Sequence, residues 1–429
     1  MSTNPIATAL RGKGLGNFLR RGAIILRRYG VTPRRMERQM ERLVEVLRRF
    51  QCRASFPIPS VVLKRNPEVA KRYSAEGMEF AIHGYRHVDH SRLSSQVQIR
   101  QLERAKAIFE QANIPVNGFR SPYLRLGDDT LDILLSLGLQ YDASQSLCWD
   151  VVNGLSTPLY RHVLGFYGAR SASRYPSLPR LRGGLVEIPY SLPDDESLIE
   201  RLHITDPNAL GAPWLAILEH TYRLGELFVL GLHPERAEFC LDALTAVLER
   251  ARSFSPPVWV ARMDEVAAWW QARSAATTLV TPAGAGAYRV MVKGPPGATV
   301  LARGVETDAP SQSWFGPDAR IEAHSFTVRA AARPVIGLSA GSDPEAASFL
   351  RQQGYIVEEG GRREDYALFF HRPTFTPEDE RPLLTQIEQH GGPLVRLGRW
   401  PNGARSALVI TGDIDSLTLW DYTLRLFGR

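Results

Sequence analysis

The sequence predicts an α/β fold with parallel strands, in a chain long enough for more than one domain. Helix-like and strand-like segments alternate from about residue 32 to residue 144, and polar side chains directly follow several of the strand-like segments. The apolar content of 44% in 429 residues supplies ample core material. Such alternation is typical of parallel sheets with crossover helices, whose functional loops gather at the carboxyl ends of the strands.

The first elements follow from start signals and periodicity. Thr32 and Pro33 begin a predicted helix over residues 32–50, in which apolar residues recur at helical spacing. Helices are also expected over 66–77, 94–113 and 128–138. The intervening strand-like segments and turns are 52–63, 78–84, 118–123 and 139–144.

The composition changes near residue 272. Residues 277–305 are punctuated by Gly and Pro, and apolar and polar residues alternate over 288–293, which predicts a small antiparallel, β-sandwich-like unit. A compact α/β unit of the flavodoxin or Rossmann type is expected next, with its last strand over 392–398. We therefore divide the chain into residues 1–272, 273–332, 333–403 and 404–429.

The composition also limits the class of protein. The net charge is +7, but no basic run has interleaved aromatics, so nucleic acid is not an expected partner. Three widely separated cysteines fit a reducing compartment. With no 18-residue apolar run and no signal-peptide pattern, we expect a cytoplasmic location or the inner face of a membrane. Residues 16–30 fit either a helix on an anionic membrane or a surface helix of its own domain.

Three of the ten histidines, His83, His87 and His90, fall within eight residues. The spacing of His83 and His87 would place both imidazoles on one face of a helical turn. Imidazole is a preferred ligand of Zn²⁺, and a catalytic zinc site usually has three protein ligands and one open position. Surface histidines can have the same spacing, but a place at the end of a strand favours a metal site.

Three ordered segments resemble one known family. They are "NPEVAKRYSAEGMEFAIHGYRH" (66–87), "FRSPY" (119–123) with Arg120, and "LGLHP" (230–234) with His233. They are similar to the polysaccharide deacetylases with a NodB-homology domain, of the carbohydrate esterase family 4 type. The resemblance covers about residues 30–270 and implies a distorted (β/α) barrel.

That family normally begins with a strand that ends in two aspartates, yet no acidic residue precedes Thr32. A similar segment occurs at the other end of the chain, where a strand over 407–411 precedes Asp413 and Asp415. We therefore expect a circularly permuted barrel, in which the first barrel strand lies at the C-terminus of the chain and the two small units are inserted before it. The alternatives are a strand donated to a neighbouring subunit and a plain surface turn.

The resemblance implies a role for each of these residues. Asp415, His83 and His87 would hold Zn²⁺ or another divalent first-row metal. Asp413 would be the general base, paired with Arg120, and His233 the general acid. The Tyr123 backbone N–H would stabilise the oxyanion. The predicted substrate contacts are Trp149, Leu230 and His90.

The function expected from the resemblance is a metal-dependent hydrolase that removes N-acetyl groups from an amino sugar in a polysaccharide or glycolipid precursor. Two alternatives remain. One is a related hydrolase that cleaves a C–N bond in a small non-sugar substrate. The other is a non-catalytic carbohydrate-binding or assembly module. The sequence leaves the oligomeric state open.

Overall fold

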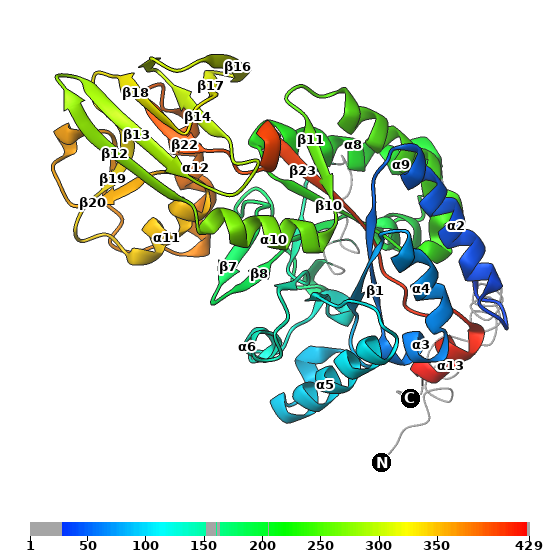
Figure 1. Ribbon diagram of the computed structural model, residues 1–429. Coiled ribbons are helices and arrows are strands. Elements are labelled where there is room, and N and C mark those ends of the chain that lie inside the picture. Colours follow the sequence, from blue (N-terminus) through cyan, green and yellow to red (C-terminus); the bar gives the residue numbers. More distant parts are fainter. Residues whose placement is uncertain (1–27, 152–159, 161–163, 205, 427–429) are drawn as a thin grey trace.

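A computed structural model describes residues 28–151, 160, 164–204 and 206–426, and the fold is given for these residues. Figure 1 shows two lobes. The larger lobe holds the first part of the chain together with its last strand, and the smaller lobe holds most of residues 277–398. Within the described ranges, no helix is long and apolar enough to cross a membrane.

The larger lobe is built on a curled, mostly parallel twelve-stranded sheet, which confirms the predicted α/β class. The strands run in the order β6-β5-β9-β10-β23-β1-β2-β3-β4-β8-β7, and β11 also pairs with β23. Their bounds are β1 Ala54–Ile58, β2 Glu79–Ile82, β3 Gly118–Phe119, β4 Tyr141–Asp142, β5 Ser146–Cys148, β6 Arg170–Ser171, β7 Arg180–Arg182, β8 Leu185–Glu187, β9 Tyr190–Leu192, β10 Leu227–Leu232, β11 Val258–Ala261 and β23 Ser406–Gly412.

The C-terminal strand β23 occupies the centre of this sheet. It pairs in parallel with β10 over six residues and with β1 at Ala54↔Ile410 and Ser55↔Thr411. All seven residues of β23 are buried. The last strand therefore lies between elements that precede it by more than 150 residues, within the same chain (Figure 1). The surface-turn alternative for residues 411–415 is wrong.

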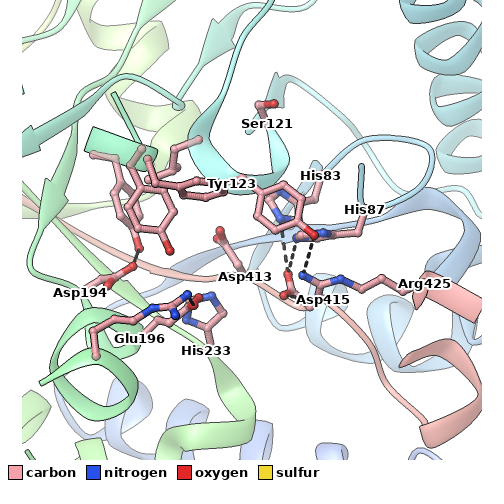
Figure 2. A pocket seen from close by; sticks show the side chains of 15 residues that line it. His83, His87, Ser121, Tyr123, Asp194, Glu196, His233, Asp413, Asp415 and Arg425 are labelled. Atoms are coloured by element: carbon pink, nitrogen blue, oxygen red, sulfur yellow. Dashed lines mark hydrogen bonds and ion pairs between the residues drawn. The ribbon is translucent and has the colours of Figure 1, made fainter. Parts of the chain in front are cut away.

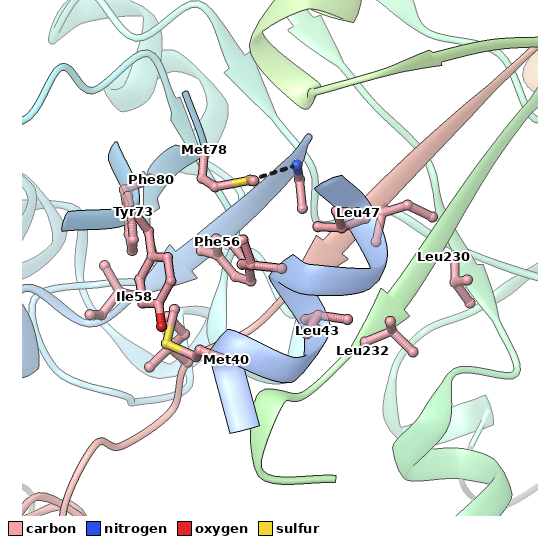
Figure 3. Packing of buried hydrophobic residues seen from close by; sticks show 14 of the residues in the cluster. Met40, Leu43, Leu47, Phe56, Ile58, Tyr73, Met78, Phe80, Leu230 and Leu232 are labelled. Atoms are coloured by element: carbon pink, nitrogen blue, oxygen red, sulfur yellow. Dashed lines mark hydrogen bonds between the residues drawn. The ribbon is translucent and has the colours of Figure 1, made fainter. Parts of the chain in front are cut away.

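Helices cover the curled sheet. Their bounds are α2 Arg34–Arg49, α3 Ser60–Arg65, α4 Pro67–Ala75, α5 Ser95–Gln111, α6 Thr130–Ser136, α8 Pro207–Leu224, α9 Ala237–Ser253, α10 Met263–Ser274 and α13 Leu419–Leu426. The predicted first helix is α2, whose apolar face packs onto β1 and β10, with Leu47 and Phe56 fully buried (Figure 3). This packing anchors the strands that carry the site.

Two local predictions are corrected. The strand expected over 52–63 ends at Ile58, and α3 begins at Ser60, because Pro59 interrupts the strand and starts the next helix. The helical turn expected for His83 and His87 is a loop. His83 directly follows β2, and His87 lies in the irregular segment that leaves it.

The smaller lobe contains three further sheets. Two four-stranded sheets have the orders β12-β13-β18-β15 and β16-β17-β14-β22, and a three-stranded parallel sheet has the order β20-β19-β21. The bounds are β12 Thr277–Gly284, β13 Ala287–Lys293, β14 Val300–Arg303, β15 Glu306–Thr307, β16 Ser311–Phe315, β17 Asp318–Ile321, β18 Ser325–Arg329, β19 Arg333–Leu338, α11 Pro344–Gln352, β20 Val357–Glu359, β21 Tyr366–Phe370, α12 Glu380–Gln389 and β22 Leu394–Leu397.

One strand of the smaller lobe differs from its predicted place. We expected residues 392–398 to complete the small α/β sheet, but β22 pairs antiparallel with β14 of the β-rich unit, from Val300↔Leu397 to Arg303↔Leu394. All four residues of β22 are buried, Arg396 included, so its burial pattern fits either sheet. The β-rich and α/β units are therefore joined by a shared strand.

The two ends of the described chain meet at the larger lobe. The Leu419 N–H donates to the Gly30 carbonyl at 2.9 Å, and the rings of Tyr29 and Tyr422 stack with centroids 5.4 Å apart. Helix α13 thus lies against the segment that enters α2. The predicted surface or membrane helix over 16–30 falls almost entirely outside the described residues.

Candidate metal centre

Three predicted ligands meet at the carboxyl ends of β2 and β23, the two strands that flank β1. The Nε2 atoms of His83 and His87 lie 3.5 and 3.2 Å from Oδ1 of Asp415. One ligand atom from each residue falls within 4.8 Å of the others. Figure 2 shows the three side chains pointing toward one another. Strands β2 and β23 bring them together although more than 320 residues separate them, because each strand borders β1.

The donor set fits a divalent metal. The Nδ1–H of His83 can donate to the Arg120 carbonyl at 2.8 Å, which leaves the Nε2 lone pair facing Asp415. Burial, and secondarily Arg425, lowers the pKa of His87 to about 4, so its ring is neutral at neutral pH, as a ligand must be. Asp415 Oδ1 is buried and accepts no hydrogen bond from the described residues.

An arginine that the sequence did not predict borders this group. Nη1 of Arg425, from α13, lies 2.6 Å from Oδ2 of Asp415 (Figure 2). Burial alone would raise the pKa of Asp415, but Arg425 and the two imidazoles hold that pKa well below its usual range. Asp415 is therefore ionised, with Oδ1 free to bind a metal. The only available signal was the position of Arg425 in the helix after "TGDID".

Asp413 faces the same cavity from the other side. Its Oδ1 lies 2.7 Å from Nη1 of the fully buried Arg120. The Arg120 guanidinium also donates to Thr411 Oγ1 at 2.9 Å and to the Ala143 carbonyl at 3.0 Å, and it lies over the Tyr190 ring. These contacts fix the guanidinium, which in turn fixes the Asp413 carboxylate. The predicted Arg120–Asp413 pair is present.

His233 lies across the cavity and has an unpredicted partner. Its Nδ1 lies 2.6 Å from Oδ1 of Asp195, and its backbone N–H donates to Oδ2 of the same carboxylate at 2.6 Å. Burial opposes the charge, yet Asp195 raises the pKa of His233 well above its ordinary value. Asp195 belongs to the acidic pair after β9, a strand-end position that could have indicated a site residue.

A cavity of about 130 Å³ connects these groups. Tyr123 lines it in a left-handed backbone conformation (φ 60°), and its ring stands edge-on to His87 at 4.7 Å. A bulky residue in that conformation is strained and is a common feature of functional sites. Among the charged and histidine side chains described, the cavity is lined by His83, His87, Asp194, Glu196, Arg201, His233, Asp413, Asp415 and Arg425.

Three predicted substrate contacts lie away from this lining. His90 is fully buried and packs against Phe119, Leu230 is a core residue beneath α2, and Trp149 stacks on His220. Those three predictions are not supported by the structure. The cause is the same for each, because sequence position gives the strand end but not the direction of the side chain.

The comparisons agree with the sequence resemblance. The model of the family described as polysaccharide deacetylase matches residues 32–141. Peptidoglycan deacetylase-like protein FGM2 of Gibberella zeae is 33% identical over 109 residues, which are 24% of this chain and 32% of that protein. The chain thus spans about a third of the length of this relative.

Solved structures that are similar to part of the chain include the following two. A probable polysaccharide deacetylase from Pseudomonas aeruginosa is 19% identical, with a TM-score of 0.44 over 54% of this chain and 72% of that one. PuuE allantoinase is 18% identical, with a TM-score of 0.44 over 55% and 72%. The family match and the relative thus show that residues 32–141 are similar to part of a polysaccharide deacetylase domain.

Proposed function

We propose that this protein is a metal-dependent deacetylase that removes N-acetyl groups from an amino sugar of a polysaccharide or glycolipid precursor. The observation that carries the proposal is the convergence of His83, His87 and Asp415 beside the Arg120–Asp413 pair and His233. The family match supports the acetylated glycan as substrate class. We also propose that the central place of β23 reflects a circular permutation of the family barrel, with the smaller lobe inserted before it.

The proposed site would hold Zn²⁺, or another divalent first-row metal, through Nε2 of both histidines and Oδ1 of Asp415. When bound, such a metal polarises a carbonyl oxygen and makes water more acidic. Asp413 would take the proton of the attacking water, with Arg120 holding its carboxylate in place. The Tyr123 backbone N–H would donate to the oxygen that becomes negative in the tetrahedral intermediate.

His233 would complete the reaction as general acid. Its contact with Asp195 keeps the ring protonated, so that Nε2–H can be delivered to the leaving amine as the C–N bond breaks. The proton removed from the attacking water and the proton given to the leaving amine are then handled by different residues. Asp413 collects one proton, and His233 supplies the other.

Zinc content and acetate release together test this proposal. We expect the purified full chain to bind zinc and to release acetate from N-acetylated chitooligosaccharides. Asp415→Asn should lose the metal, whereas Asp413→Asn should keep it and lose acetate release by about 10²-fold or more. The control is Asp132→Asn, an exposed carboxylate on α6 that should change neither quantity.

Three outcomes would contradict the proposal. If Asp415→Asn binds zinc as the wild type does, the three residues are not the ligands, and the permuted strand does not complete the site. If the zinc-loaded wild type hydrolyses only small non-sugar amides, the glycan substrate is wrong. If it releases no product from either class, the site is a non-catalytic binding module.

A further inference from the structure

A second pocket lies where the two lobes meet, and we call it the junction pocket. Its volume is about 320 Å³, within the range of small-molecule sites. It lies between the end of α8 at Leu224, the turn between β16 and β17, helix α12, and the segment that leads into β23. This is the amino end of β23, opposite the end that carries Asp413, and nothing in the proposed function uses it.

Arginines dominate the lining of the junction pocket. Six arginines and three carboxylates line it, so six positive charges against three negative leave a formal excess of three positive charges. The arginines are Arg223, Arg303, Arg381, Arg396, Arg399 and Arg405. The carboxylates are Glu226, Asp318 and Glu388. An excess of this size in a partly enclosed space concentrates anions.

Three of these arginines form ion pairs with the three carboxylates. Arg381 donates to Glu226, with Nη2 3.0 Å from Oε2. Arg396 pairs with Asp318 and lies 3.7 Å from Glu388, and Arg303 lies 3.6 Å from Glu388 and 3.9 Å from Asp318. These contacts join the β-rich unit to α12. Of the remaining arginines of the pocket, only Arg399 has a carboxylate within 4.0 Å among the described residues, which is Glu388 at that distance.

Arg399 and Arg405 are buried without a close counter-ion. They are 5% and 6% exposed. Arg399 Nη1 donates to the Leu224 carbonyl at 2.9 Å, but its Nη2 has only Glu388 at 4.0 Å, and its Nε and Nη2 make no hydrogen bond to the described residues. No carboxylate of the described chain lies within 4.0 Å of Arg405, whose Nε is also unpaired.

The surroundings of Arg405 make its buried positive charge unfavourable. Its Nη2 donates to the Arg223 carbonyl, and its guanidinium lies 4.2 Å from the centre of the Phe315 ring. Burial, together with Arg396 and Arg399, lowers the pKa of Arg405 to about 10. A buried cation without an anion is strongly unfavourable in a protein interior. A bound anion would remove that penalty.

We propose that the junction pocket binds a small organic phosphate or diphosphate, with its phosphoryl oxygens at Arg399 and Arg405. The planar guanidinium matches phosphoryl oxygens through paired hydrogen bonds. An excess of three positive charges matches a phosphate ester or a diphosphate better than a single carboxylate. The rings and methyl groups of Phe315 and Leu384 offer an apolar surface for the organic part of the ligand.

Calorimetric titration of the full chain with inorganic pyrophosphate tests this proposal, with acetate as the anion of low charge. We expect pyrophosphate to bind and acetate not to bind at the same ionic strength. Arg399→Gln should weaken pyrophosphate binding at least about tenfold, the effect of losing one charge-assisted contact. Arg362→Gln, which changes an exposed arginine far from the pocket, should leave the binding unchanged.

A matched pair of variants covers the case in which Arg399→Gln fails to fold. Thr385 lies on the exposed side of α12 and lines the pocket, and its hydroxyl donates only to the Arg381 carbonyl of its own helix. Thr385→Glu places a carboxylate at the pocket and should abolish pyrophosphate binding. Thr385→Gln introduces a side chain of the same shape as Glu but without the charge, and it should retain the binding. Equal binding by the two variants, or no binding of pyrophosphate by the wild type at millimolar concentration, would overturn the proposal.

Discussion

At the scale of single residues, the contact between His233 and Asp195 predicts how the stability of the protein depends on pH. Asp195 raises the pKa of His233 in the folded protein, so the pair stabilises the fold fully below the unfolded histidine pKa of about 6.5. That contribution is lost as the pH rises through the folded pKa. Asp195→Asn should therefore destabilise the protein more at pH 5.5 than at pH 9, as measured by urea denaturation.

The same variant should change the ionisation of the ring. NMR titration of His233 should give a lower pKa in Asp195→Asn than in the wild type, because burial of the ring and Arg236 both lower the pKa and only Glu235 then raises it. Asp206→Asn, which alters an exposed helix cap at a distance from the site, controls for the loss of a charge. An unchanged His233 pKa would show that Asp195 does not hold the proton on the ring.

Some of the site residues could be predicted from the sequence, and others are found only in the structure. Residue type, chain order and strand-end position indicated His83, His87 and Asp415, which the structure brings together. The strand-end position of Asp195 could have indicated a site residue, but the partners of Asp195 and Arg425 could not be assigned, because local sequence does not encode these side-chain contacts. Chain order gives the end of the sheet where a residue lies, whereas its partners depend on packing.

At the scale of elements, α2 holds the strands that carry the site. Leu47 is fully buried between α2 and the sheet, close to Phe56 of β1 (Figure 3). Leu47→Ala should lower the free energy of unfolding by about 2–5 kcal/mol, because it removes apolar contacts and leaves a cavity. Glu45→Ala, on the exposed face of the same helix, should change it by no more than about 0.5 kcal/mol. Urea denaturation measures both, and equal effects would contradict this role of α2.

Whether an element could be predicted depends on its length and on the periodicity of its apolar residues. Helix α2 was predicted because a start signal and an apolar periodicity of 3.6 agree over 16 residues. Strands β3 and β4 have two residues each, too few for any periodicity. The partner of β22 could not be predicted, since four buried residues carry no information about the sheet that receives them.

At the scale of the whole molecule, one hydrophobic cluster crosses the boundary between the lobes. It includes Val229 and Ala407 of the central sheet together with Ile336 and Leu383 of the smaller lobe. The rings of Trp270 and Trp400 lie 5.6 Å apart at the crossing. Separate domains usually unfold separately, but a shared core couples them.

We therefore expect the two lobes to unfold in one cooperative transition. The midpoints from tryptophan fluorescence and far-UV circular dichroism should coincide during urea denaturation. Trp270→Phe should lower both midpoints together, because Trp270 is fully buried at the crossing. Trp420→Phe should change neither, since Trp420 is 60% exposed on α13. Two resolved transitions in the wild type would mean that the shared cluster does not couple the lobes, and the smaller lobe would then be an independent domain.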